Sequence, residues 1–264
     1  MRTNLHLKKL VVGNWKMNPE TQEQAVELIK SLERYLKDSE PNCENVICPP
    51  FVFLAECAKR RHNLKLGAQD VSFAAAGSMT GEISAGELAD LGVEYVILGH
   101  SERRMYQGET DSVVNAKLIA ALQHKLIPIL CLGGEEGAIE SEMKTLVTKQ
   151  FVKCIHNVAA EDLKKIVYAY EPVWAISTMK NSKPASGEHA RDVIEHIYQI
   201  LERHMPAAKA RKAKVLYGGT VNKDNVSLYA RYPEISGALV GAASLNADNF
   251  YEIIKEFERE SIHR

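Results

Sequence analysis

The sequence contains no long apolar run, no cysteine pair at a metal-binding or redox spacing, and almost no net charge. Its five cysteines form no C-x-x-C pattern, so we expect reduced thiols. Residues 1–9 mix basic and polar side chains, and the apolar stretch that follows is too short for a signal peptide or a membrane span. We therefore expect a cytoplasmic protein without a membrane partner. The formal net charge of -1 argues against nucleic acid as a partner.

Motifs for metals and nucleotides are also missing. The chain has no H-E-x-x-H pattern, no Gly-Lys-Ser/Thr of a P-loop and no G-x-G-x-x-G, so we expect neither a metal nor a cofactor. It has no Ser/Pro-rich linker or low-complexity segment, which predicts a single domain over residues 1–264. A chain of this length can bury about three quarters of its unfolded surface in one core.

Short apolar runs typical of buried strands alternate with amphipathic runs typical of helices. The predicted strands cover residues 10–14, 45–48, 64–68, 95–98, 127–132, 165–170, 214–217 and 237–240. Helical spacing of apolar residues is clearest over 21–36 and 189–201, and a last helix is expected over 246–257. Eight alternations with continuously apolar strands predict a parallel (β/α)₈ barrel, an α/β fold. An open, doubly wound sheet is the alternative.

Polar side chains follow three of the predicted strands at the ends where such a barrel carries its chemistry. Asn14 and Lys16 follow the first strand, His100 follows the fourth, and Glu171 follows the sixth, where Pro172 stops the strand. Alone, a strand-end acid is equally compatible with a helix cap or an ion pair, and a lone histidine with a structural role. Their joint placement predicts a catalytic group.

Small residues follow the last two strands. These are Gly218, Gly219 and Thr220 after the seventh strand, and Gly241 and Ala242 after the eighth. Small side chains let backbone N–H groups approach an anion, and these loops are the usual phosphate site of the fold. The alternative is that the glycines only turn the chain. We expect a small phosphorylated ligand.

The sequence resembles the triosephosphate isomerase family over nearly its whole length. The matching stretches are Gly-Asn-Trp-Lys-Met-Asn at 13–18, Gly-Ala-Gln at 67–69, Thr-Gly-Glu at 80–82, Gly-His-Ser-Glu-Arg-Arg at 99–104, Tyr-Glu-Pro-Val-Trp-Ala-Ile at 170–176, Tyr-Gly-Gly-Thr-Val-Asn at 217–222 and Leu-Val-Gly at 239–241. The resemblance implies a TIM barrel and a cofactor-independent isomerase of glycolysis and gluconeogenesis. Such an enzyme interconverts dihydroxyacetone phosphate and D-glyceraldehyde 3-phosphate through an enediol(ate).

The resemblance also implies a role for each strand-end residue. Glu171 transfers a proton between neighbouring carbons, and His100 transfers protons between the oxygens as a neutral imidazole. In that family a helix N-terminus keeps this imidazole uncharged, which is an established example of such tuning. Lys16 supplies a fixed positive charge, and Asn14 positions the substrate and, with Lys16, helps to bind it. Glu102 is expected to be linked to Lys16, or to form a purely structural ion pair.

The segment after Ile176 departs from the family, which usually continues with Gly-Thr-Gly-Lys as a lid over the site. This chain has an unusual lid tip from Ser177 to Ser182, without glycine. One alignment matches residues 183–185 to the hinge after the lid, and the other matches Lys180 to the family lysine. Ser177 is the candidate for the phosphate contact of the lid.

Smaller departures affect nearby loops. Thr220 replaces a serine and keeps the hydroxyl, and Ala242 replaces the second glycine of a usual pair and keeps the backbone N–H. We expect Thr220, Gly241 and Ala242 to bind phosphate. Cys131 resembles the family cysteine near the base and is expected to pack. Residues 133–134 read Gly-Gly where the family has Gly-Glu, and the sequence offers no reason for this.

The loop from Gln69 to Ser84 is longer than a compact domain needs. The resemblance implies that it inserts into a second subunit of a homodimer, with Thr80 near the partner's active-site asparagine and lysine. A disordered surface loop is the alternative. Two other functions also remain open: the same chemistry on a longer phosphosugar such as a tetrulose phosphate, and a non-catalytic binding relative.

Overall fold

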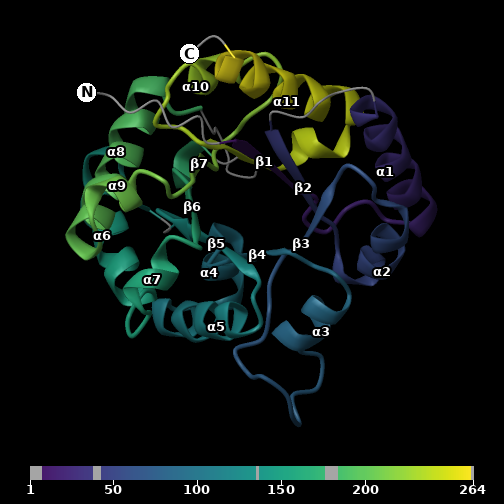
Figure 1. The fold of residues 1–264 in the computed structure, drawn as a ribbon, viewed down its shortest axis with the longest axis horizontal. Coiled ribbons are helices and arrows are strands. Elements are labelled where there is room, and N and C mark those ends of the chain that lie inside the picture. Colours follow the sequence, from purple (N-terminus) through teal and green to yellow (C-terminus); the bar gives the residue numbers. More distant parts are fainter. Residues whose placement is uncertain (1–7, 38–42, 135–136, 176–183, 263–264) are drawn as a thin grey trace.

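The computed structural model describes residues 8–37, 43–134, 137–175 and 184–262. Over these ranges, parallel strands form a closed barrel in which each strand pairs with the next along the chain and the last pairs with the first (Figure 1). The strands are β1 (Lys9–Asn14), β2 (Cys43–Cys48), β3 (Lys65–Ala68), β4 (Tyr95–Leu98), β5 (Ile127–Leu132), β6 (Val167–Tyr170), β7 (Val215–Tyr217) and β8 (Gly237–Val240). The predicted (β/α)₈ barrel is confirmed, and the open sheet is wrong because β8 pairs with β1.

Helices surround the barrel and cover its outer face (Figure 1). They are α1 (Gln22–Leu36), α2 (Phe51–Arg60), α3 (Ala85–Asp90), α4 (Ser101–Gln107), α5 (Asp111–Gln123), α6 (Met143–Cys154), α7 (Ala160–Leu163), α8 (Gly187–His204), α9 (Ala207–Ala210), α10 (Ser227–Ala230) and α11 (Ala247–Ile262). The 3₁₀ turns within the described ranges are η1 (Glu140–Glu142), η2 (Val173–Ala175) and η3 (Ala242–Leu245). Among the described residues, no helix combines the length and the apolar character that crossing a membrane requires.

Each predicted strand is present, but several ends differ for physical reasons. β2 begins two residues before the predicted start because Cys43 pairs in register with Lys9 of β1. β6 begins two residues late because the Lys165 N–H donates to the carbonyl of Asp162, which closes the turn of α7. The last helix extends past its predicted end to Ile262. Pairing partners and local turns, which a periodic pattern does not contain, decide these ends.

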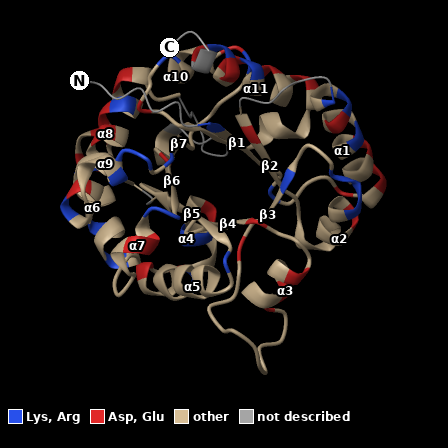
Figure 2. Cartoon of the chain, viewed as in Figure 1, with Lys and Arg blue, Asp and Glu red and all other residues tan. Residues whose placement is uncertain are grey.

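Side-chain caps and apolar stripes fix the longer helices. α1 begins with a capping box in which the Thr21 hydroxyl accepts from the Gln24 N–H and the Gln24 side chain accepts from the Thr21 N–H. α8 begins after Ser186, whose hydroxyl accepts from the His189 N–H. In the view of Figure 2, basic and acidic residues are interspersed along the described outer helices. The outer surface is therefore the solvated face of an ordinary barrel.

Two apolar layers pack on the two faces of the barrel wall. The inner layer fills the barrel with Leu10, Val12, Val46, Cys48, Tyr95, Ile97, Ile129, Cys131, Val167, Ala169, Leu216 and Leu239. The outer layer lies between the strands and the helices. Because side chains alternate along each strand, the inward series continues past the apolar layer to polar residues at both ends. At the amino ends of the strands, Glu44 accepts hydrogen bonds from Tyr95 and Lys214.

Candidate active site

A cavity of about 310 Å³ lies at the carboxyl ends of the strands. Its lining includes Asn14 and Lys16 after β1, His100 after β4, Gly218, Gly219 and Thr220 after β7, and Gly241 and Ala242 after β8. These segments are far apart in the sequence and meet because the carboxyl ends of all strands point to the same end of the barrel. The cavity therefore collects the polar and small residues that the sequence singled out at strand ends.

Lys16 is held in an unusual backbone conformation. Its φ of 53° lies in the left-handed region, which is rare for a residue with a long side chain. Two side chains stabilise this turn: the Asn14 amide oxygen accepts from the Lys16 N–H at 3.0 Å, and the Gln69 amide donates to the Lys16 carbonyl at 2.7 Å. The Lys16 ammonium lies 2.6 Å from a carboxylate oxygen of Glu102. This is the link to Glu102 that the resemblance implied.

His100 is the N-cap residue of α4, and this position fixes its tautomer. Its Nδ1 accepts a hydrogen bond from the Glu102 N–H at 3.2 Å. A nitrogen that accepts from a backbone N–H carries a lone pair, so the proton of the neutral ring is on Nε2. The ring is buried with 7% of its surface exposed. The imidazole thus presents an N–H donor on the side away from the helix.

Glu171 lies directly after β6 and is almost fully buried. Its Oε2 accepts from the Ser101 N–H at 2.9 Å, and its Oε1 lies 3.1 Å from Nε2 of His100. Glu171 is not part of the cavity lining: a Cβ at Gly218, which does line it, would be 3.0 Å from the Glu171 Cγ. The carboxylate is therefore held just behind the cavity wall and must turn away from Ser101 to reach a ligand.

The candidate phosphate-binding residues lie on the cavity lining in the loops after β7 and β8. Thr220 lines the cavity, and its carbonyl accepts from the Asn225 amide at 3.0 Å, which holds the loop after β7. Gly241 precedes η3, and a Cβ there would lie 3.5 Å from the Lys16 Cε, so its backbone adjoins the lysine side chain. Ala242 begins η3 and also lines the cavity. Ser177 lies outside the described residues.

Sequence reasoning missed two residues of this arrangement. Ser101 contributes a backbone N–H to Glu171, and Gln69 supports the carbonyl of Lys16. Ser101 could have been found, because the first N–H groups of a helix have no partner within the helix and this helix starts at a strand end. Gln69 carries no comparable signal, since its contact spans 53 residues of sequence.

The thiol nearest the base is inert. Burial raises the pKa of Cys131 well above its usual value, and the negative charge of Glu171 adds to the rise. A thiol that stays protonated is a poor nucleophile, so Cys131 fills space inside the barrel, as expected. In the ranges that the structure covers, no cluster of His, Cys, Asp and Glu is arranged to hold a metal ion.

Comparison with known proteins gives one consistent result. A family model described as triosephosphate isomerase matches residues 9–257. The triosephosphate isomerase of Caldanaerobacter subterraneus subsp. tengcongensis is 42% identical over 251 residues, which cover 94% of this chain and 98% of the relative. The enzyme of the same name from Alkaliphilus oremlandii is 41% identical over 250 residues, with the same two coverages. That of Clostridium botulinum strain Loch Maree is 40% identical over 248 residues, covering 93% of this chain and 98% of the relative.

Proposed function

The chain belongs to the triosephosphate isomerase family, and we propose from this premise that Glu171, His100, Lys16 and Asn14 carry out its reaction. The enzyme is an aldose–ketose isomerase of glycolysis that interconverts dihydroxyacetone phosphate and D-glyceraldehyde 3-phosphate. The single observation that carries the assignment of residues is the arrangement around the cavity. A lysine and an imidazole N–H border it, and a buried carboxylate lies directly behind its wall.

Glu171 acts as the only base in this proposal. It removes a proton from the carbon next to the carbonyl and returns it to the neighbouring carbon, which one carboxylate can do if it reaches both. His100 donates from Nε2 to the substrate oxygen that becomes negative and moves the proton between the two oxygens. The 3.1 Å separation of His100 Nε2 and Glu171 Oε1 supports this division of work, because a carboxylate that turns from Ser101 into the cavity starts out beside the imidazole N–H.

Lys16 and the loops after β7 and β8 bind the charged parts of the substrate. The Lys16 ammonium stabilises the enediolate and the phosphate, while Asn14 holds the lysine turn and positions the substrate. Thr220, Gly241 and Ala242, with Ser177, take the phosphate. The support for this assignment is the position of the first three on the cavity lining, beside the lysine.

The experiment that tests the function compares two substrates in a coupled assay. We expect rapid turnover of D-glyceraldehyde 3-phosphate and a kcat/KM at least about tenfold lower for a tetrulose phosphate, because an additional hydroxymethylene group changes the distance between the reacting carbons and the phosphate. Higher kcat/KM on the tetrulose phosphate would assign the enzyme to the longer sugar. If neither substrate is turned over, the chain is a non-catalytic binding protein. The complete set of candidate catalytic residues argues against that outcome.

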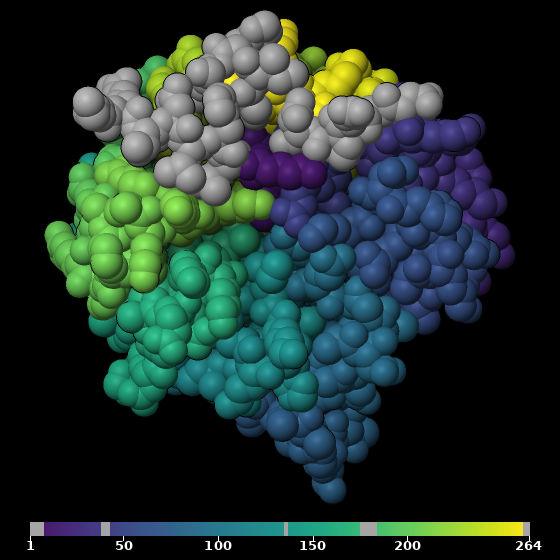
Figure 3. Space-filling view, viewed as in Figure 1, coloured from purple at the N-terminus to yellow at the C-terminus, as the bar shows by residue number. Residues whose placement is uncertain are grey.

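We also propose a homodimer formed through the loop from Gln69 to Ser84, including Thr80. The loop projects from the barrel between β3 and α3 (Figures 1 and 3). Phe73 and Met79 on it are 50% and 38% exposed. Two further large apolar side chains are exposed on segments that carry candidate catalytic residues: Met17, which follows Lys16, is 92% exposed, and Tyr106, near the end of the helix that His100 caps, is 67% exposed. Exposed large apolar side chains favour burial against a partner.

An aspartate at position 79 is expected to weaken this dimer. Wild type should have twice the mass of one chain by sedimentation equilibrium at micromolar concentration, and Met79→Asp should dissociate at least about tenfold more readily, because it buries a charge in the interface. The control is Val152→Asp on α6, which is 50% exposed and remote from the loop. A monomeric wild type, or equal effects of the two variants, would contradict the proposal.

Location and domain organisation are further parts of the proposal. We propose a cytoplasmic enzyme whose residues 1–264 form one domain. All five cysteines are buried and unpaired, which suits a reducing compartment. The barrel and its helices extend from Lys9 to Ile262, so the core of such a domain spans nearly the whole chain.

A further inference from the structure

Among the residues that the structure describes, no aspartate or glutamate lines the active-site cavity. Its polar side chains are the lysine and the histidine of the proposed mechanism, the hydroxyl of Thr220 and the amides of Asn14, Asn222 and Asn249. Asn249 differs from the others because it belongs to an outer helix, α11, whereas the others follow strands. It therefore reaches the cavity from the outer layer of the barrel.

The start of α11 carries acidic side chains on both sides of Asn249 in the sequence. Asp248 lies 3.3 Å from the Lys223 ammonium and Glu252 lies 2.7 Å from that of Lys255. The two acidic side chains are 52% and 41% exposed, and neither lines the cavity. The helix thus contributes an uncharged amide to the cavity, while its nearest carboxylates pair with cations at the surface.

The Asn249 residue connects two loops of the site. Its side-chain Oδ1 accepts from the Lys223 N–H, in the loop after β7, at 2.9 Å. Its own N–H donates at 2.9 Å to Oδ1 of Asn246, which directly follows η3. The loops after β7 and β8 are the ones that carry the candidate phosphate-binding residues. Asn249 therefore helps to hold these two loops beside each other.

The nitrogen of the same amide is available to a ligand. Because Oδ1 accepts from the Lys223 N–H, the two N–H donors of the amide lie on the other branch of the side chain, at Nδ2. These donors have no hydrogen-bond partner within the described part of the chain. Asn249 is half-buried and lines the cavity, so its Nδ2 can offer hydrogen bonds to an anion there.

We propose that Asn249 is a specificity-determining residue for the phosphate group of the substrate. Its oxygen holds the loop after β7, its nitrogen offers donors, and its neutrality keeps negative charge off the cavity lining. The neutrality is expected to matter most, because a phosphate group carries a charge of about -1.5 to -2 at pH 7 and a carboxylate on the lining would repel it. The inference deepens the proposed function and rests on the binding of a phosphorylated triose in this cavity.

The test is a pair of variants of the full-length protein, Asn249→Asp and Asn249→Ala. The aspartate can still accept from the Lys223 N–H but adds a negative charge, whereas the alanine removes the acceptor and adds no charge. We expect KM for D-glyceraldehyde 3-phosphate to rise about tenfold in Asn249→Asp and about threefold in Asn249→Ala. In both, kcat should change by less than about threefold, because the groups that act on the carbons are untouched.

Both variants should fold, since an acid in the first turn of a helix is favourable and alanine is the best helix former. The dissociation constant of inorganic phosphate, measured by calorimetric titration, should rise in the same order as KM. This second measurement needs no turnover. If wild type does not turn over triose phosphate, the proposed function fails, and the order of the phosphate affinities still decides the inference.

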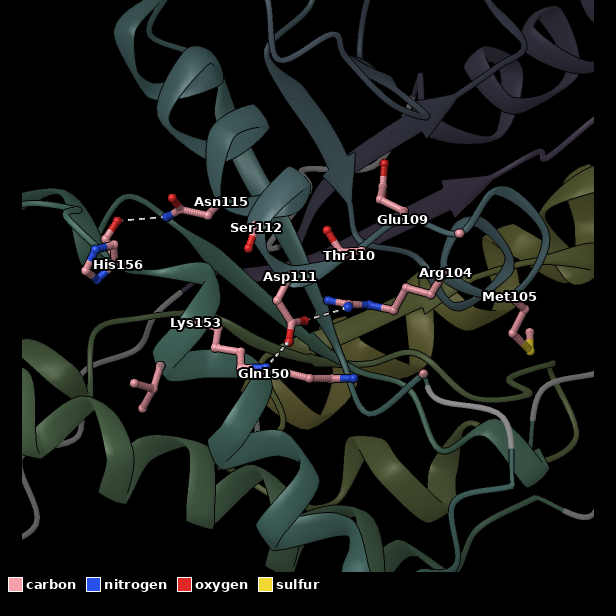
Figure 4. Close-up of a pocket in the computed structure, with 13 residues that line it drawn as sticks. Arg104, Met105, Glu109, Thr110, Asp111, Ser112, Asn115, Gln150, Lys153 and His156 are labelled. Atoms are coloured by element: carbon pink, nitrogen blue, oxygen red, sulfur yellow. Dashed lines mark hydrogen bonds and ion pairs between the residues drawn. The ribbon is translucent and has the colours of Figure 1, made fainter.

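The matched control is Ser112→Asp, which adds the same charge to the first turn of α5. Ser112 is exposed and lines a separate cavity of about 900 Å³ between α4, α5 and α6, where Figure 4 shows it with Asp111. As the described residues form them, this cavity and the active-site cavity share no lining residue. KM and the phosphate dissociation constant of Ser112→Asp should therefore stay within about 1.5-fold of wild type.

Three results would overturn the inference. Normal KM and phosphate affinity in Asn249→Asp, with a loss only in Asn249→Ala, would show that the residue merely anchors the loop after β7. An equal rise in Ser112→Asp and Asn249→Asp would assign the effect to the net charge of the protein and not to the cavity lining. A fall in kcat at unchanged KM would place Asn249 in the chemical step, contrary to a role in phosphate binding.

Discussion

Replacing Glu171 with glutamine is expected to lower kcat by about three to four orders of magnitude, with KM changed by less than about fivefold. An amide cannot take the proton from carbon, but its oxygen can still accept from the Ser101 N–H that holds the carboxylate in wild type. The substitution therefore removes the base and leaves the surrounding structure in place. Coupled-assay kinetics on D-glyceraldehyde 3-phosphate measure the effect.

Two further variants make this result specific. Glu171→Asp keeps the carboxylate but withdraws it by one methylene, so it should retain more activity than the glutamine variant and much less than wild type. Glu252→Gln on α11, where the side chain is 41% exposed, pairs with Lys255 and is not part of the cavity lining, should leave kcat within twofold. Full activity in Glu171→Gln would show that another group moves the proton. If the rate at which deuterium from the solvent enters the product falls in parallel with kcat, the defect lies in proton transfer.

The predictable part of this molecule is the part that depends on local pattern. The strand at Tyr95–Leu98 was predicted to the residue because it is a short apolar run bounded by charged and glycine residues. By contrast, β2 extends to Cys43, because the register with Lys9 of β1 continues the ladder beyond the apolar pattern. The candidate site residues also follow from this local pattern, because a predicted barrel directs attention to the residues at the carboxyl ends of its strands.

The geometry around the base depends on contacts between distant segments, so the sequence pattern does not contain it. The left-handed turn at Lys16 requires Gln69 from the end of β3, and the position of Glu171 behind the cavity wall requires Ser101 at the start of α4. These are the places where tertiary packing, and not composition or spacing, sets the chemistry.

At the opposite end of the barrel, Glu44→Gln is expected to destabilise the protein by about 2 kcal/mol at pH 7. The Glu44 side chain is 16% exposed and accepts from Tyr95 at 2.7 Å, Lys65 at 2.6 Å and Lys214 at 2.7 Å. Burial by itself raises the pKa of Glu44, but the hydrogen bonds from Lys214, Lys65 and Tyr95 outweigh it and lower the pKa from 4.5 to about 2. A shift of this size corresponds to about 3 kcal/mol, which partial solvation at the barrel end reduces.

The pH dependence of this loss separates the charge of Glu44 from its packing. A carboxyl whose pKa is lower in the folded protein than in the unfolded chain stabilises the fold above the unfolded value and loses that contribution as the pH falls from about 4.5 toward 2. The difference between wild type and Glu44→Gln in urea unfolding should therefore be constant from pH 7 to 5.5 and shrink below pH 4.5. Protein concentration must be held fixed, because association adds to stability.

Glu27→Gln on α1, with a side chain that is 66% exposed, should change the unfolding free energy by less than about 0.5 kcal/mol. A difference for Glu44→Gln that persists undiminished at pH 3 would assign the effect to packing and refute the role of its charge.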